Sequence, residues 1–162
     1  GAGAAVARTA IELAERGVED VLVRGKRSHG DAHTTWDRGG INGALGTHDP
    51  EDSWAIHAAD TLNEGHFVND PDKVETVTKQ MPDRLRELDE WGMAFSRTDD
   101  GEIDQRFFGA QSFRRTAFAG DHTGESMLNT LVDRAQELSV PYRENVMITT
   151  VLSDGDRAYG AV

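Results

Sequence analysis

One histidine near the start of the sequence is placed where it could bond to a ligand held by glycines. His33 lies a few residues before the adjacent glycines Gly39 and Gly40, and a second glycine-rich stretch, Gly1–Ala5, opens the chain. Glycine lacks a Cβ atom, so the main chain at these places can lie directly against a ligand. We interpret both stretches as parts of one nucleotide-cofactor site, with His33 reaching the reactive ring of the cofactor.

The opening stretch matches most of a dinucleotide-binding fingerprint. Gly1 and Gly3 supply the first two glycines of the pattern G-x-G-x-x-G, and Val6 stands where the third belongs. The first glycine permits a tight turn, the second lets the main chain approach a pyrophosphate, and the phosphates bind N–H groups at the start of the next helix. Apolar residues at helical spacing predict that helix over residues 4–16. The stretch therefore indicates a pyrophosphate site.

The strand that follows distinguishes between kinds of dinucleotide. Residues 20–24 are a short β-branched run that predicts a buried strand, and the strand ends in Arg24, Gly25 and Lys26. An NAD site carries an acidic residue near this place, where it binds the ribose hydroxyls. The basic ending disfavours NAD as the cofactor.

Two further groups have a chemical and a structural interpretation. His29, Asp31 and His33 alternate as metal ligands can, but the stretch is loop-like and nothing else completes a coordination set. The adjacent Arg114 and Arg115 could bind a dicarboxylate, because guanidinium groups pair well with carboxylates. They could equally pair with acidic side chains of the chain itself, which is the interpretation we favour.

The remaining histidines have structural interpretations. His57 and His66 flank a predicted amphipathic helix and are interpreted as surface or hydrogen-bonded residues. His48 precedes Asp49 and Pro50, a combination typical of a turn.

The charge of the chain limits its partners. Its 162 residues include 29 acidic and 17 basic side chains, a formal net charge of −12. Repulsion between this charge and phosphate argues against nucleic acid or an anionic membrane as the main partner. Lysine is scarce, with Lys26, Lys73 and Lys79 the only ones. An acidic, lysine-poor surface fits a halophilic protein, because concentrated salt screens the repulsion between carboxylates.

Cysteine is absent, which excludes disulfides, thiolate nucleophiles and Cys-ligated metal or iron–sulfur sites within this chain. No apolar run approaches the roughly 20 residues that span a bilayer. No signal peptide is recognisable either. We therefore predict no direct membrane insertion and a cytoplasmic location.

Mixed helical and strand patterns predict an α/β fold with a βαβ start and added β-hairpins. Since a glycine fingerprint normally follows a buried strand, we expect a first strand upstream of Gly1 and interpret residues 1–162 as an incomplete domain. The expected elements are a helix over 4–16, a strand over 20–24, a long loop over 25–47 with a short helix near 41–45, a helix over 52–63, two helices over 71–92 divided at Pro82, a hairpin over 94–105, a helix over 124–138 and a closing hairpin that turns at Asp154-Gly155.

Five stretches in a fixed order carry a resemblance to a known family. They are "GAGAA", "HTTWDRGGINGALG", "EDSWAIHAADTLNEG", "DDGEIDQRFFGAQSFRRTAFAGDHTG" and "MLNTL". In order and spacing they resemble the flavoprotein subunits of succinate dehydrogenase and fumarate reductase, a family that also includes L-aspartate oxidase. The stretches extend over nearly the whole chain. The resemblance implies a Rossmann-like FAD-binding domain, here residues 1–162 as a partial domain, without the family's capping domain and with no second domain.

The resemblance implies which residues hold FAD. The pyrophosphate would lie on Gly1, Ala2, Gly3, Ala4 and Ala5, and the adenosine end near Gly25, Lys26, Arg27 and Ser28. The stretch along the flavin would include Ala32, His33, Thr34, Thr35, Gly39 and Gly40. In the succinate dehydrogenase branch, a histidine followed by Thr and then by Gly-Gly bonds covalently to the 8α-methyl carbon of the flavin, and His33 matches it. The chain has Asp37-Arg38 where the family commonly has Ala-Gln.

The resemblance also implies an activity, hydride transfer between a C4 dicarboxylate and FAD. In the family, the substrate-binding and proton-transferring residues belong to later segments, so we expect no catalytic residue and no turnover in this chain alone. The implied partners are an iron–sulfur subunit and a membrane anchor at the inner face of the cell membrane. L-aspartate oxidase, an enzyme of NAD biosynthesis that usually lacks the histidine, and a cofactor-free assembly module are the alternatives.

Overall fold

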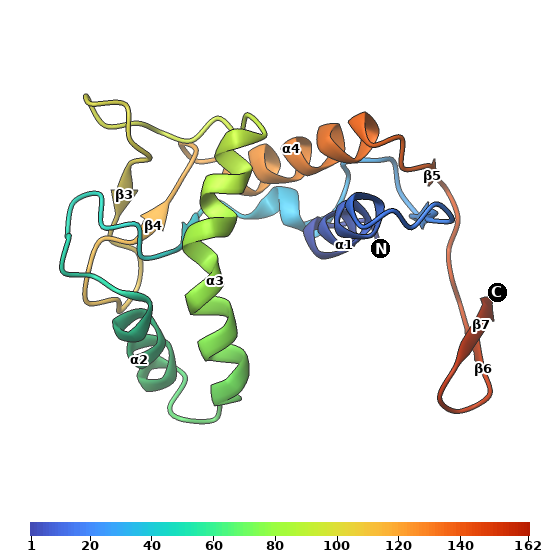
Figure 1. Cartoon of the computed structure of the whole chain (residues 1–162), viewed down its shortest axis with the longest axis horizontal. Coiled ribbons are helices and arrows are strands. Elements are labelled where there is room, and N and C mark those ends of the chain that lie inside the picture. Colours follow the sequence, from blue (N-terminus) through green and yellow to red (C-terminus); the bar gives the residue numbers. More distant parts are fainter. The chain divides into compact units, whose positions relative to one another are not determined.

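The computed structural model describes all of residues 1–162, which form two compact units. The first unit joins residues 1–35 to residues 128–162, and the second comprises residues 36–127. The elements in chain order (Figure 1) are α1 (Ala4–Glu15), β1 (Val23–Arg24), the 3₁₀ helix η1 (His33–Trp36), β2 (Ile41–Asn42), α2 (Trp54–Glu64), α3 (Pro71–Glu90), β3 (Gln105–Arg106), β4 (Thr116–Ala117), α4 (Thr123–Glu137), β5 (Tyr142–Arg143), β6 (Val151–Ser153) and β7 (Ala158–Ala161).

The first unit is built on one helix and a pair of parallel strands. β1 pairs with β5, so that Val23 lies opposite Tyr142 and Arg24 opposite Arg143. The alanine-rich side of α1 packs on this pair, with Ala2, Ala10 and Val23 buried and Val21, Val140 and Tyr142 against them. The small side chains let the helix approach the strands closely. The start of α1 and the end of β1 thereby line one cavity.

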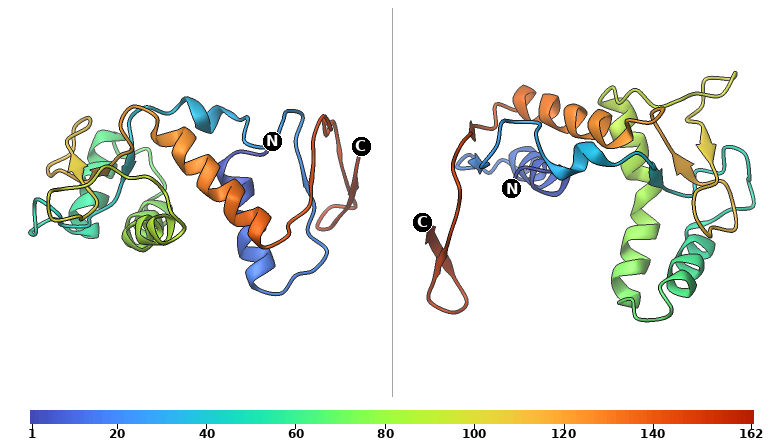
Figure 2. Two further views of the ribbon diagram at one scale, coloured as in Figure 1. Left: turned by 90° about the horizontal axis from the view of Figure 1, so that it is seen from above. Right: turned by 180° about the vertical axis from the view of Figure 1, so that it is seen from behind.

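The second unit combines a helix pair with a small antiparallel sheet. α2 and α3 lie side by side (Figures 1 and 2), and the three strands have the order β2-β4-β3. Ile41 of β2 and Gln105 of β3 both lie opposite Ala117 of the central strand β4. Ala117 and Leu85 of α3 are both fully buried. Gly40, just before β2, packs against Thr116 and Ala117 of β4.

Most of the predicted helices and turns are confirmed. α1, α2 and α4 fall within two residues of the helices predicted over 4–16, 52–63 and 124–138. Ser53 caps α2, its Oγ accepting from the N–H of Ile56 at 3.3 Å. The turns at Asp100-Gly101 and Asp154-Gly155 place their glycines at positive φ, +86° and +106°. The first of these hairpins has only the bridge between Arg97 and Ile103.

Three predictions of local structure are wrong. α3 is one continuous helix, not two, with Pro82 inside it. Proline removes one helical hydrogen bond, but Thr78, Leu85 and Leu88 on both sides of it are buried, and their packing keeps the helix continuous.

The residues near 41–45 form strand β2 rather than a short helix, because Ile41–Asn42 pairs with Thr116–Ala117, which are distant in sequence. The short helix is η1, further upstream. The strand expected over 20–24 is shorter in the structure, where only Val23–Arg24 form β1. None of the helices combines the length and the apolar character that a bilayer crossing requires.

Candidate cofactor site

The N-terminus of α1 is open to an anion. Gly3 is the N-cap residue, and having no side chain it leaves the first turn without a side-chain cap. The N–H of Ala4 donates to Thr34 Oγ1 at 3.2 Å, and the first turn contains no acidic residue. The unpaired N–H groups of a helix start and the helix dipole both favour negative charge. The predicted pyrophosphate position therefore has the required electrostatics.

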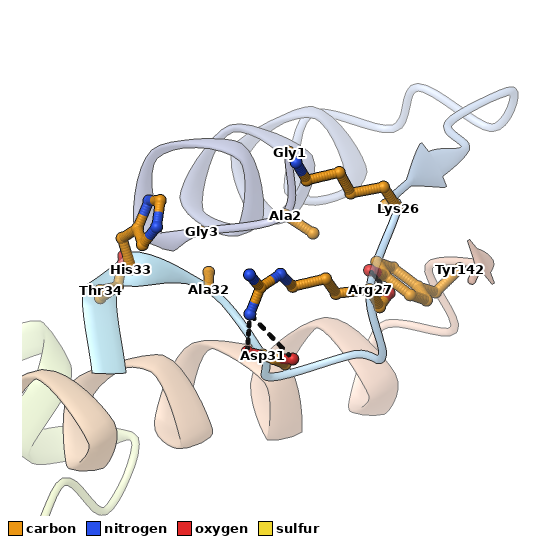
Figure 3. A pocket seen from close by; sticks show the side chains of 11 residues that line it. Gly1, Ala2, Gly3, Lys26, Arg27, Asp31, Ala32, His33, Thr34 and Tyr142 are labelled. Atoms are coloured by element: carbon orange, nitrogen blue, oxygen red, sulfur yellow. Dashed lines mark hydrogen bonds and ion pairs between the residues drawn. The ribbon is translucent and has the colours of Figure 1, made fainter. Parts of the chain in front are cut away.

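A cavity of about 270 Å³ opens at this helix start. Figure 3 shows its walls, which come from the opening glycines, the chain after β1, the segment before and within η1, and β5. Its lining residues are Gly1, Ala2, Gly3, Gly25, Lys26, Arg27, Asp31, Ala32, His33, Thr34 and Tyr142. Nine of the fifteen residues predicted to bind the cofactor are in this list. The structure therefore brings together stretches 1–3, 25–27 and 32–34, as the sequence suggested.

The other predicted residues lie outside the cavity wall. Ala4 and Ala5 belong to the first turn of α1 directly behind it. Ser28 is exposed, and its carbonyl accepts from the N–H of Asp31 at 3.0 Å. Thr35 turns its hydroxyl back to the carbonyl of Ala32 at 2.8 Å, which stabilises η1.

Tyr142 is a wall residue that the sequence reasoning missed. β5 carries it to Gly25, and its hydroxyl donates to the carbonyl of Arg27 at 3.0 Å. His29 stacks on its ring, with centroids 4.0 Å apart. Burial raises the pKa of Tyr142, and the nearby Glu144 adds to this; burial also lowers the pKa of His29. Only the parallel pairing of β1 with β5, which joins distant segments, could have revealed this contact.

Gly25 is required by the same contact. A Cβ atom at this position would lie 1.9 Å from the hydroxyl oxygen of Tyr142 and 3.3 Å from Cβ of Ala2. The main chain is also held on both sides, since the N–H of Gly25 donates to Arg143 and its carbonyl accepts from Val146, each at 3.0 Å. The chain cannot move away without breaking these bonds.

We therefore expect Gly25→Ala to destabilise the protein by about 1–3 kcal/mol, the usual cost of overpacking. Urea unfolding of the intact protein measures this cost. Tyr142→Phe removes the clashing oxygen, so the double variant should recover part of the loss. A double variant no more stable than Gly25→Ala alone would show that the clash is not the cause.

Charged residues surround the cavity without closing it. Arg27 Nη1 lies 3.3 Å from Oδ1 of Asp31, and Figure 3 draws this pair. Both side chains are about half exposed, so the pair is weak and can rearrange around a ligand. Lys26 is exposed and lines the cavity beside Gly25. Lys26 and Arg27 thus place two positive charges at the cavity wall.

His33 begins η1 and is exposed at the cavity wall (Figure 3). The next residue, Thr34, fastens this turn to α1 through the Ala4 N–H, and a Cβ on Gly3 would come within 3.0 Å of its hydroxyl. A side chain at position 3 would therefore collide with η1. His33 therefore lies in a short helical turn that is hydrogen-bonded to the start of α1.

The diglycine belongs to the second unit, where it lies against β4. Gly40 has φ +132°, and a Cβ there would be 2.5 Å from Thr116 Cγ2 and 2.6 Å from the Ala117 carbonyl oxygen. Gly39 faces the ring of Phe108, which a Cβ would approach to 3.0 Å. Gly40 is therefore needed for close contact with β4, and Gly39 packs against the ring of Phe108.

The charged pair before the diglycine is structural. Arg38 Nη1 donates to the carbonyl of Asp121 at 3.0 Å. The carbonyl of Asp37 accepts from the N–H of Gly124 at 3.1 Å, and its Oδ1 accepts from the N–H of Gly39 at 3.4 Å. Through these bonds the Asp37-Arg38 segment contacts the chain around the start of α4.

The adjacent arginines pair with internal carboxylates. Arg115 is fully buried and bonds to Asp52 at 2.8 and 3.0 Å and to Asp60 at 2.6 Å. Arg114 forms an ion pair with Asp49, in which Nη2 lies 2.7 Å from Oδ1, and its hydrogen bonds lower the pKa of Asp49 to about 2. Burial raises the pKa of Asp60, but hydrogen bonds from Ser112 and Arg115 outweigh it and keep that pKa low. The structural interpretation of both arginines is supported.

His57, which was expected at the surface or in a hydrogen bond, is buried instead. It is 7% exposed on α2, and its buried Nδ1 has no hydrogen-bond partner. Burial and the charge of Arg115 lower its pKa, which favours the neutral imidazole. The sequence could not show this burial, because it depends on how α2 packs. His66 is exposed, as expected.

The geometry fits a dinucleotide with a pyrophosphate at its centre. A side chain on Gly3 or Gly25 would run into neighbouring atoms, and the uncapped start of α1 opens into the cavity they line. Such glycine-lined helix starts are typical of dinucleotide-binding proteins. The chain belongs to the FAD binding domain family, whose model matches residues 1–162.

Individual relatives show which FAD-binding proteins the chain is similar to. The chain is 38% identical over 162 residues to a subunit of the fumarate reductase (CoM/CoB) of Methanothermobacter marburgensis, covering 100% of the chain and 30% of that protein. It is 35% identical over 164 residues to the mitochondrial succinate dehydrogenase flavoprotein subunit of Oryza sativa, covering 96% and 26%. The chain thus spans less than a third of the length of these relatives.

Solved structures agree with this assignment. The Mycobacterium smegmatis Sdh1 complex matches with a TM-score of 0.93 at 35% identity, over 99% of this chain and 29% of that one. The Escherichia coli quinol fumarate reductase protein FrdA matches with a TM-score of 0.93 at 29% identity, over 99% and 27%. The predicted fold is confirmed as that of the FAD-binding domain of succinate dehydrogenase and fumarate reductase flavoproteins.

Proposed function

We propose that this chain is the FAD-binding part of an enzyme that transfers a hydride between a C4 dicarboxylate and FAD. The observation that carries the proposal is the cavity at the uncapped start of α1, which has His33 in its wall. Similarity to fumarate reductase and succinate dehydrogenase subunits supports the substrate class. None of the relatives named above is an L-aspartate oxidase.

Each part of the cavity has a role in this proposal. Gly1, Gly3 and the N–H groups of the first turn of α1 hold the pyrophosphate, and Lys26 and Arg27 add positive charge toward it. Gly25, which lines the cavity, would lie near the adenosine end. When bound, FAD supplies the hydride chemistry, and the protein supplies position and electrostatics.

His33 is the proposed covalent attachment residue. Its imidazole lies exposed at the cavity wall and is the nucleophile for a bond to the 8α-methyl carbon of the flavin. Forming that bond replaces one N–H and one C–H bond by an N–C bond and releases two protons and two electrons. Oxidised FAD would itself be the two-electron oxidant for this step, and the electron acceptor of the enzyme would then reoxidise it. The attachment withdraws electron density from the ring, which suits oxidation of succinate.

The proposed assembly follows the same relatives. An iron–sulfur subunit would take the electrons, and a membrane anchor would hold the enzyme at the inner, cytoplasmic face of the cell membrane. Residues 1–162 would form one partial domain, with the substrate-binding residues elsewhere in the enzyme. This agrees with the engagement of Arg114 and Arg115 by internal carboxylates, which leaves neither free for a dicarboxylate.

An absorption spectrum and a dye-reduction assay of the intact natural protein test the function. We expect flavin bands and reduction of an artificial acceptor by succinate but not by L-aspartate. Aspartate-dependent reduction would establish the oxidase alternative instead. A colourless folded protein would establish the cofactor-free assembly module.

We also infer that the protein works in concentrated salt, because acidic residues outnumber basic ones by 29 to 17. Raising KCl from about 0.1 M to about 1 M shortens the Debye length from about 10 to about 3 Å. Screening should raise the free energy of unfolding and with it the melting temperature. At this chain length, each kcal/mol of unfolding free energy raises the melting temperature by about 2–4 °C. Sucrose at matched osmolality screens no charge and is the control. A melting temperature that rises equally in sucrose, or not at all in KCl, would contradict the inference.

A further inference from the structure

Arg106 on β3 holds the carbonyl groups before the diglycine. Its Nη2 donates to the carbonyl oxygen of Gly39 at 2.7 Å and to that of Arg38 at 3.3 Å. Its guanidinium carbon lies 4.3 Å from the centre of the Phe118 ring. The side chain therefore reaches from the edge strand of the sheet to the loop that leads into β2.

The positive charge of Arg106 has no carboxylate partner. Its contacts are two carbonyl oxygens and an aromatic face, and its buried Nε has no hydrogen-bond partner. By contrast, Arg97, Arg114 and Arg115 in the same unit all form ion pairs. Carbonyl and ring contacts orient a guanidinium without neutralising it, so Arg106 keeps its positive charge beside this loop.

The same contacts set the direction of a peptide group. In the trans peptide between Gly39 and Gly40, the carbonyl oxygen faces Arg106, so the N–H of Gly40 points to the opposite side. Gly40 packs closely against Thr116 and Ala117, so the peptide group before it cannot rotate freely. Arg106 thus polarises a peptide whose N–H is turned away from the guanidinium.

We propose that Arg106 is a positioning residue that fixes the diglycine and raises the reduction potential of a flavin bound against it. The inference rests on the proposed function and on the expectation from the family resemblance that Gly39 and Gly40 lie along the flavin. Reduction by a hydride adds negative charge to the ring, so a fixed positive charge and a fixed N–H donor stabilise the reduced form more than the oxidised form. The residue acts through the diglycine main chain.

The test is the midpoint potential of the flavin in the intact protein, measured by spectroelectrochemical titration. Arg106→Gln keeps an N–H donor for the carbonyls but removes the charge. In this variant we expect the affinity for reduced flavin, divided by the affinity for oxidised flavin, to fall about tenfold. For a two-electron couple this lowers the midpoint potential by about 30 mV. Arg106→Lys keeps the charge and should stay near the wild-type potential.

Arg97→Met is the matched control, because Arg97 is exposed and its charge is already balanced by Asp89. Equal potentials in Arg106→Gln and the wild type would overturn the inference, as would a tenfold effect in Arg106→Lys. If Arg106→Gln does not fold, the Arg106→Lys result decides alone. A wild-type protein without flavin would overturn the proposed function as well, which separates the two failures.

Discussion

Replacing His33 by serine should abolish acid-stable flavin in the intact protein. The side chain is exposed at the wall of a cavity lined by the glycines of the α1 start, and Thr34 fastens its turn to α1. Serine keeps the turn but lacks a nitrogen nucleophile for the 8α-methyl carbon. The flavin should therefore pass into the supernatant on acid precipitation, whereas in the wild type it stays with the pellet.

The non-covalent flavin should also have a lower midpoint potential, because the electron-withdrawing imidazole is gone. His122→Ser is the control, since His122 is exposed outside the cavity and should leave the attachment intact. Flavin that remains in the pellet of His33→Ser would assign the attachment to another residue. Wild-type flavin that is wholly soluble in acid would show that the cofactor is held without a covalent bond.

Arg115→Met should have the largest effect on stability. The guanidinium is fully buried between Asp52 and Asp60, and its removal leaves two carboxylates without their cation. Breaking a buried pair in this way costs about 3–5 kcal/mol. Since domains are stable by only about 5–15 kcal/mol, the variant should unfold at much lower urea concentration than the wild type.

The neighbouring Arg114→Met is the matched control. Its side chain is 39% exposed, so loss of its pair with Asp49 should cost about 1 kcal/mol or less. Neutralising both carboxylates, as in Asp52→Asn with Asp60→Asn, should restore part of the stability of Arg115→Met. Equal urea midpoints for Arg114→Met and Arg115→Met would contradict the central role of the buried pair.

The sequence was informative wherever local rules apply. Apolar periodicity located α1, α2 and α4, and glycine at a turn located both hairpins. The glycine fingerprint at Gly1 and Gly3 located the start of α1. Each of these features depends on a few consecutive residues.

Other features depend on contacts between distant segments. Pro82 predicts a break, but packing on both sides of it keeps α3 continuous. The partners of Arg115 lie 55 and 63 residues away in the chain, so either a dicarboxylate or internal acids could satisfy its sequence pattern. The burial of His57 follows from the packing of α2. Side-chain type alone cannot decide between such partners.

By itself the sequence determined the kind of ligand, because bare glycines before a helix, a basic strand end and a well-placed histidine are properties of short segments. Only the tertiary structure decided what surrounds these segments. Tyr142 covers Gly25 through the pairing of β1 with β5, and Arg106 reaches the diglycine across the sheet. The physical reason is that these contacts join residues far apart in the chain, whose encounter is set by packing and strand pairing rather than by local conformational preference.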